Sequence, residues 1–228
     1  MKPVFRAKTS PQNKHTHLLI VLLVNFVLSP FLQGIIGRLF SSAISLYAII
    51  VIIQTFSLDR KLSRLYIGIA VLAFGLETVA RFGWYSLEKA SIYFLCQDVV
   101  YAVCLGLAAF FVLRDILLCQ HITADTIRGG ICAYLLIGFF WALLYAIVAN
   151  FDNEAFSQTA SEVEFYSQAI HFSFTTLTTL GYGDIVPLTP LATMLTNLEA
   201  IIGQLYPSTL IAILVANYTA DRTDRDNK

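Results

Sequence analysis

The chain has 228 residues, of which 57% are hydrophobic and 13% are charged, and its formal net charge is zero. An ordinary soluble domain carries about a quarter charged residues. This composition excludes a typical soluble globular domain and indicates a chain embedded in lipid. The neutral net charge gives no electrostatic case for nucleic acid as a partner.

Long apolar stretches divide the chain. A helix needs about 20 apolar residues to cross a bilayer core, and six stretches qualify. Their residue ranges are 18–36, 39–57, 65–82, 91–117, 129–150 and 190–217. Spans must be helical because lipid offers the backbone no hydrogen-bond partners. The sequence therefore predicts an all-α membrane protein with six transmembrane helices, the first of them kinked near Pro30.

The beginning of the chain also has the outline of a signal peptide. Residues 1–17 are basic and residues 18–28 are apolar, which is the order of segments in a secretory signal. However, no A-x-A-like cleavage site follows, and the apolar stretch resumes after Pro30. We therefore treat residues 18–36 as a membrane span.

A seventh apolar stretch, residues 166–178, lies between the last two spans and is too short to cross. It is rich in serine and threonine. Non-helical or half-spanning segments are tolerated at membrane depth only where protein or water surrounds them. We therefore expect a re-entrant half-helix between the fifth and sixth spans.

Charge sets the expected orientation. Basic residues concentrate in segment 1–17, in the links after the second and fourth spans, and in tail 219–228, whereas segment 151–165 carries four acids and no base. Cytoplasmic segments carry the excess of Lys and Arg. We expect both termini in the cytoplasm and the chain in the plasma membrane. Five spans would put the acidic link and the basic N-terminus on one side, so six are favoured.

The four cysteines give no sign of a metal site. Cys96, Cys104, Cys119 and Cys132 lie in or beside apolar runs and are not spaced as metal-ligand pairs. They are typical of small core or lipid-facing residues. We expect neither a structural disulfide nor a bound cofactor.

The segment after the half-helix has the features of a cation site. Residues 179–183 read Thr-Leu-Gly-Tyr-Gly. A dehydrated cation needs a cage of oxygens, which backbone carbonyls supply if they point one way. Gly181 and Gly183 reach the necessary dihedrals without Cβ strain. The hydroxyl of Thr179 offers a further ligand, and Tyr182 is expected to face away from the ion and pack against the half-helix.

One such loop supplies only one face of a cage. A ring of four loops needs four chains, which predicts a cyclic homotetramer around one axial pore. The half-helix would also aim the negative end of its dipole at a cation below the loop.

These residues resemble the potassium channel superfamily, in particular its two-helix pore domain. Thr-Leu-Gly-Tyr-Gly-Asp at 179–184 stands where the family has Thr-Val-Gly-Tyr-Gly-Asp, and segment 199–206 is similar to the start of the inner helix. The resemblance covers about residues 128–218. It implies passive potassium conduction, with K⁺ as the permeant ligand and no enzyme activity. It implies K⁺ sites at Thr179, Leu180, Gly181 and Tyr182, within a filter that ends at Gly183.

The resemblance also suggests supporting and gating residues. We expect Asp184, Thr175 and Glu199 to support the filter, with Asp184 tied to the half-helix and Glu199 bonded to nearby backbone. A gate is predicted from a set of inner-helix residues at helical spacing, of which the first would be the hinge. These are Gly203, Pro207, Leu210 and Leu214.

Two features depart from relatives. Many family members have two tryptophans where this chain has His171 and Phe172, so their hydrogen-bonded cuff around the filter is not expected here. His171 is read as a packed residue, with a proton sensor as the alternative. The fourth stretch, 91–117, contains only Arg114 as an arginine, whereas a voltage sensor carries several. Steep voltage gating is therefore not expected.

Several alternatives stay open. A potassium transporter pore subunit would carry several degenerate filters and assemble from one or two copies. A weakly selective cation channel would share the loop. An intramembrane aspartyl protease would need Asp184 and Asp98 in one site. Residues 18–127 form a four-span peripheral domain of unassigned role, in which Glu77 and Arg81 are expected to pair.

Overall fold

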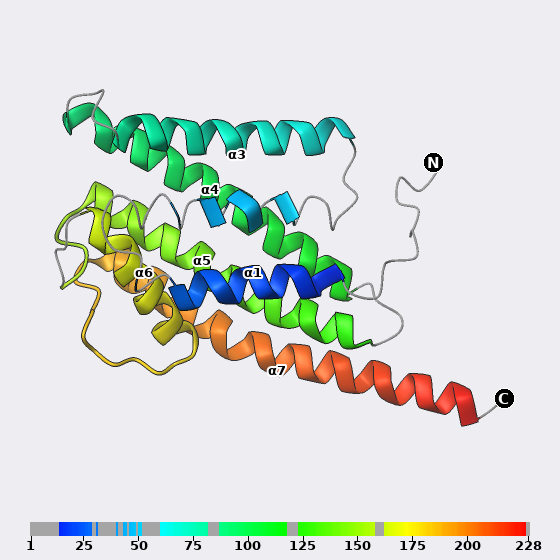
Figure 1. Ribbon diagram of the computed structural model, residues 1–228. Coiled ribbons are helices and arrows are strands. Elements are labelled where there is room, and N and C mark those ends of the chain that lie inside the picture. Colours follow the sequence, from blue (N-terminus) through cyan, green and yellow to red (C-terminus); the bar gives the residue numbers. More distant parts are fainter. Residues whose placement is uncertain are drawn as a thin grey trace, which may run out of the picture.

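The computed structural model describes residues 14–28, 31, 40, 43–44, 46–48, 50–51, 60–81, 87–117, 123–157 and 162–226. Among the described residues, six helices have defined bounds, residues 40, 43–44, 46–48 and 50–51 are also helical, and one isolated bridge joins Phe156 and Pro187. An all-helical fold is confirmed for these residues. The helices are α1 (Lys14–Leu28), α3 (Arg60–Arg81), α4 (Leu87–Leu117), α5 (Ala124–Phe151), α6 (Glu162–Leu177) and α7 (Pro190–Asp226). Figure 1 shows their arrangement.

Three helices among the described residues are long and apolar enough to cross a membrane: Leu95–Leu117, Ala124–Phe151 and Pro190–Ala216. They coincide with the fourth, fifth and sixth predicted spans, and the chain is a membrane protein. The first predicted span begins in α1, whose apolar part His15–Leu28 is shorter than a span. The second predicted span lies mostly outside the described residues, as do the side chains of Glu77 and Arg81. Six spans remain a prediction.

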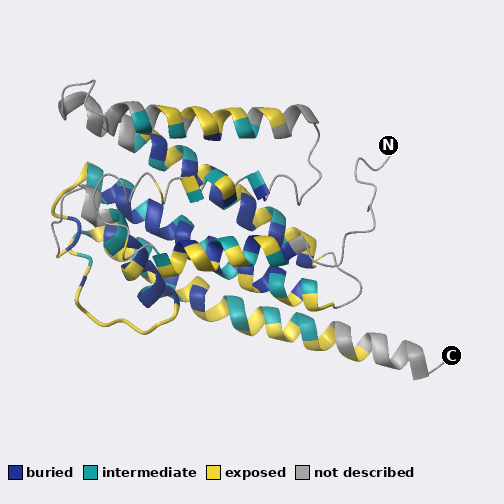
Figure 2. Cartoon of the chain, in the orientation of Figure 1, coloured by how far each residue is buried: buried dark blue, intermediate teal, exposed yellow. Residues whose placement is uncertain are grey.

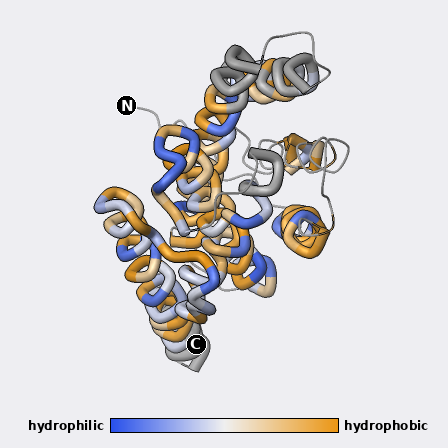
Figure 3. Tube along the Cα trace, turned by 90° about the vertical axis from the view of Figure 1, so that its left-hand side faces the viewer, coloured by the Kyte–Doolittle hydropathy of each residue, from blue (hydrophilic) through white to orange (hydrophobic). Residues whose placement is uncertain are grey.

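Helix α5 is the centre of the structure and contacts α1, α4, α6 and α7, while α3 packs on the far side of α4. The apolar sequence of α5 is surrounded by protein, with 61% of its most hydropathic window buried. The corresponding value for α7 is 11%, and Figure 2 shows exposed residues along much of this helix. Figure 3 views the helices nearly end-on and shows hydrophobic residues along most of them. Helix α7 therefore keeps an apolar face free.

The helix ends gather at two poles of the bundle. The start of α1, the start of α5 and the end of α7 lie at one pole, and α6 lies at the other (Figure 1). Arg64, Arg114 and Arg128 lie near the ends of α3, α4 and α5 at the first pole. This arrangement is the one that the positive-inside argument requires.

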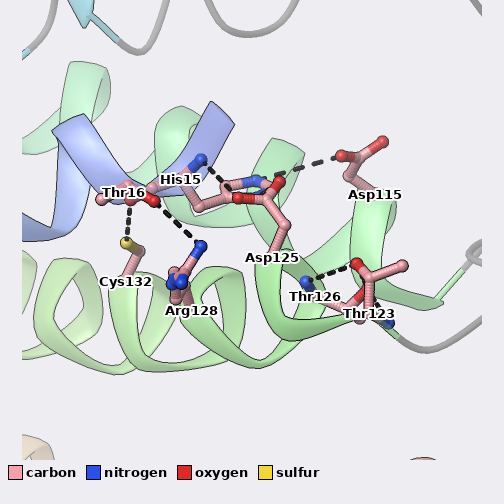
Figure 4. A network of polar contacts seen from close by, with 8 residues as sticks. All are labelled: His15, Thr16, Asp115, Thr123, Asp125, Thr126, Arg128 and Cys132. Atoms are coloured by element: carbon pink, nitrogen blue, oxygen red, sulfur yellow. Dashed lines mark hydrogen bonds and ion pairs between the residues drawn. The ribbon is translucent and has the colours of Figure 1, made fainter. Parts of the chain in front are cut away.

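A polar network fixes α1 at the first pole (Figure 4). The carboxylate of Asp125, in the first turn of α5, accepts from the backbone N–H of His15 at 3.0 Å and lies 2.9 Å from its ring Nδ1. Asp115 of α4 lies 4.0 Å from His15 Nε2. An anion suits the N-terminus of a helix, so Asp125 holds the first turn of α1 against the corner between α4 and α5.

Candidate functional site

The predicted filter loop is anchored to the last turn of α6. This helix ends at Leu177, and the amides of the next residues turn back onto it. The carbonyl of Thr175 accepts from the N–H groups of Leu180 at 2.8 Å and Gly181 at 3.1 Å. The N–H of Thr179 donates to the carbonyl of Thr176 at 2.9 Å. Thr175, expected as a supporting residue, contacts the loop through its backbone carbonyl.

The backbone of the loop alternates in handedness. Thr179, Gly181 and Gly183 have positive φ values of 60°, 53° and 76°, and Leu180 and Tyr182 do not. In an extended chain successive carbonyls point to opposite sides, and reversing the sign of φ at every second residue brings them toward one side. Glycine adopts such values readily, but Thr179 is β-branched and a positive φ there is unusual. No sequence pattern predicts the positive φ of Thr179.

His171 of α6 contacts the outer end of the loop. Its Nε2 lies 2.8 Å from Oδ2 of Asp184, and its ring stacks on Tyr182 with centroids 5.8 Å apart and planes inclined by 8°. Tyr182 thus lies against α6, and Asp184 contacts the same helix. The side chains of His171 and Asp184 are 43% and 47% exposed, so His171 packs on the Tyr182 ring at the surface of this chain.

Hydrogen bonds determine the charge state of Asp184. Desolvation raises the pKa of a carboxyl, but its effect is outweighed here by hydrogen bonds from His171 and from the N–H groups of Asp184 and Ile185. Together these lower the pKa of the Asp184 carboxyl below its ordinary value. The outer end of the loop therefore holds a carboxylate.

Behind the loop, one carboxyl joins three helices. Glu199 of α7 is fully buried. It accepts from the hydroxyl of Tyr145 on α5, and its Oε1 lies 2.5 Å from Oγ of Ser173 on α6. The sequence predicted a bond from Glu199 to backbone, whereas the structure gives bonds to two side-chain hydroxyls. These partners lie 54 and 26 residues away along the chain, and no sequence motif joins them.

Gly203 lies where α7 crosses the end of α6. A Cβ at this position would come within 2.0 Å of the carbonyl oxygen of Leu177. The hydroxyl of Tyr134 on α5 donates to the same carbonyl at 3.1 Å. Only glycine permits this approach, so Gly203 sets the position of α7 against the end of α6.

The structure corrects the predicted gate. Gly203 is buried and Leu210 is half-buried, and a Cβ at Gly130 of α5 would lie 2.6 Å from Cδ2 of Leu210. These residues face α5 and α6 of the same chain, not a free surface. The opposite stripe of α7 is exposed: Ile201 54%, Leu205 59%, Ile211 60% and Val215 59%. Gly203 and Leu210 of the predicted set therefore lie on the packing face, and the free face carries other apolar residues.

Pro207 lies inside α7, which continues from Pro190 to Asp226. Proline lacks the N–H that would bond to the carbonyl four residues earlier, which is that of Gly203. The close approach to α6 and the missing helix bond thus occur at one place.

Asp98, proposed as a protease partner of Asp184, lies on α4, whose neighbours are α3 and α5.

A short helix, a loop with alternating handedness and a long apolar helix follow one another in this part of the chain. Residues 129–220 match the family described as "Ion channel". This part of the chain is similar to the ion channel family, and the relatives that it resembles are potassium channels.

Two relatives show how far the similarity extends. The chain is 33% identical over 100 residues to "Potassium voltage-gated channel protein shk-1" of Caenorhabditis elegans. The matched region is 43% of this chain. It is 37% identical over 54 residues to "Inward rectifier potassium channel Kirbac3.1" of Paramagnetospirillum magnetotacticum. This matched region is 24% of this chain. The matches span 18% of the length of each relative. The matched family consists of ion channels and not of enzymes.

Proposed function

We propose that this chain is a subunit of a potassium-selective channel that conducts K⁺ passively. The carbonyls of Thr179, Leu180, Gly181 and Tyr182, with the Thr179 hydroxyl, would replace the water of the ion. The observation that carries the proposal is the alternation of positive φ at 179, 181 and 183. Ions would move through successive sites by mutual repulsion.

The site is incomplete in one chain, so the proposal includes assembly into a homotetramer. Leu180 and Tyr182 are 56% and 67% exposed although they are apolar or aromatic. A largely apolar groove of about 620 Å³ also lies on the free face of α7, lined by residues from Leu188 to Ile201. Copies arranged about a four-fold axis would cover these surfaces and complete the ring of carbonyls.

The proposal also covers topology. The channel would have six spans per subunit, α6 as the re-entrant helix, and residues 128–218 as the pore domain behind the peripheral domain 18–127. The basic pole, with both termini, would face the cytoplasm of the plasma membrane. The free face of α7 with Ile211 and Val215 would line the pore below the filter, where an apolar constriction can gate by dewetting. Strong voltage dependence is not part of the proposal.

The test is ion flux from liposomes that contain only the purified chain. We expect K⁺ flux to exceed Na⁺ flux at least about a hundredfold. The variant Gly181→Val should abolish flux, because a β-branched residue is strained at positive φ. We expect this variant to assemble like the wild type. Equal Na⁺ and K⁺ flux would favour a weakly selective cation channel. A complex of one or two copies would favour a transporter subunit.

A further inference from the structure

The carboxyl of Glu199 lies in the apolar interior between three helices. It has no solvent exposure, and it lies within a helix that spans the membrane. The side chains that face it are uncharged: Tyr145 and, within electrostatic range, Tyr134 from α5, and Ser173 from α6. A carboxylate placed among neutral groups in lipid-embedded protein pays a large desolvation cost.

The hydrogen bonds of Ser173 allow the protons to be counted. Its Oγ lies 2.8 Å from the carbonyl oxygen of Gly138 and 2.5 Å from Oε1 of Glu199. A hydroxyl has one proton to donate, and a carbonyl can only accept. If Ser173 donates to Gly138, the proton between Ser173 and Glu199 must come from Glu199. If Ser173 donates to an ionised Glu199 instead, two acceptor oxygens face each other at the Gly138 contact.

The hydroxyl of Tyr145 does not remove this requirement. It also has one proton, which it donates to Oε2 of Glu199. This bond leaves Oε1 without a proton unless the carboxyl itself carries one. A neutral carboxylic acid satisfies every contact at once, because it donates from one oxygen and accepts at the other.

We propose that Glu199 is a positioning residue that works as a neutral carboxylic acid and holds α6 behind the filter. Its O–H donates to Ser173, and Ser173 donates to the carbonyl of Gly138, so that one chain of bonds runs from α7 through α6 to α5. Ser173 lies two residues before Thr175, whose carbonyl accepts from the amides of Leu180 and Gly181. Glu199 thus acts on the filter through α6 and does not contact the ion. The positioning role rests on the function proposed above.

Three variants separate a neutral acid from a carboxylate. Glu199→Gln keeps a donor and an acceptor in the same places, so we expect K⁺ flux and K⁺ over Na⁺ selectivity within about twofold of wild type. Glu199→Ala and Ser173→Ala each break the chain of bonds and should lower K⁺ flux about tenfold or more. Glu154→Gln, at an exposed acid in the loop after α5, is the matched control and should change nothing.

Infrared difference spectra read the proton directly. The carbonyl stretch of a protonated carboxyl should be present at pH 7, lost in Glu199→Gln and kept in Glu154→Gln. The inference is overturned if Glu199→Gln assembles but conducts as poorly as Glu199→Ala, or if no such band depends on Glu199. A wild-type protein without K⁺-selective flux would refute the proposed function instead, and the infrared band would still decide the protonation of Glu199.

Discussion

Thr179 has a φ of 60°, a value that costs a non-glycine residue about 1–3 kcal/mol. The strain is held by hydrogen bonds from the amides of Thr179, Leu180 and Gly181 to the last carbonyls of α6. Strained residues persist only where the surroundings determine them, and they concentrate at functional sites. At this position the strain lies at the inner end of the proposed ion path, where the threonine hydroxyl would serve as a ligand.

The contact between His171 and Asp184 gives a prediction for acid dependence. A carboxyl with a lowered pKa keeps its contacts above the ordinary carboxyl range and loses them as the pH falls through its own lower pKa. K⁺ flux from liposomes should therefore persist down to about pH 4 and fall only below it. His171→Phe keeps a ring against Tyr182 but removes the hydrogen bond, so its acid step should lie at higher pH.

The matched comparison is Asp184→Asn, which has no carboxyl to protonate. This variant should conduct less at neutral pH and show no acid step. Acid steps at the same pH in wild type and His171→Phe would show that His171 does not hold the Asp184 carboxylate.

At the scale of elements, the sequence predicted the positions of helices along the chain, which depend on residues that are neighbours in the sequence. Helix α5 runs from Ala124 to Phe151 against a predicted 129–150, and α6 from Glu162 to Leu177 against 166–178, because continuous apolar runs determine membrane helices. The loop at 179–183 was located from its two glycines and from its resemblance to the potassium channel superfamily. The face of α7 was not predictable, because lipid, pore and protein contacts all select apolar residues. Gly203 and Leu210 were therefore placed on the wrong side.

Gly203→Ala tests the crossing of α7 and α6. The added Cβ would meet the backbone carbonyl of Leu177 at 2.0 Å, and a backbone atom cannot rotate away as a side chain does. We expect a loss of at least about 1–3 kcal/mol in unfolding free energy, measured by denaturant unfolding in detergent, and a loss of K⁺ flux.

Gly68→Ala in α3 is the control, since nothing lies within 4 Å of the added Cβ. Alanine is the better helix former, so this variant should be neutral or more stable by about 0.5–1 kcal/mol. Equal stability of the two variants would mean that α7 does not approach α6 as closely as the structure has it.

The attachment of α1 to the pore domain is also a property of elements. His15 is buried against Gly129 and bonded to Asp125, and Phe26 at the other end of α1 contacts Phe174 of α6 with ring centroids 4.5 Å apart. His15→Ala removes a buried hydrogen bond worth about 1–3 kcal/mol. Amide hydrogen exchange should therefore speed up along α1 and remain unchanged in α5.

His17, two residues further on, is exposed, so His17→Ala should leave exchange in α1 unchanged. If both variants speed up exchange in α1 equally, the loss of a histidine side chain from α1 causes the effect, and the His15–Asp125 contact does not hold α1 against α5.

At the scale of the whole molecule, a single chain leaves the surface of its loop and one face of α7 exposed. Tyr182 in the loop is exposed, and the groove between Leu188 and Ile201 lies on the free apolar face of α7. Lipid alone would cover the helix face but would leave the polar backbone of the loop without partners. In the proposed assembly, neighbouring copies would cover the apolar helix face, and water and ions between them would meet the polar backbone of the loop.

The number of copies that conduct together can be counted by mixing. Gly181→Val should assemble with wild-type chains but place a distorted loop in the ring, and a cage of carbonyls fails if one face is wrong. In a tetramer with equal amounts of both chains, only about one sixteenth of the complexes would be wholly wild type. K⁺ flux should therefore fall to about that fraction, and not to half. Lys228→Ala, in the tail beyond the described residues, is the control and should leave the flux of the mixture unchanged. A linear dependence on the wild-type fraction would mean that each chain conducts alone.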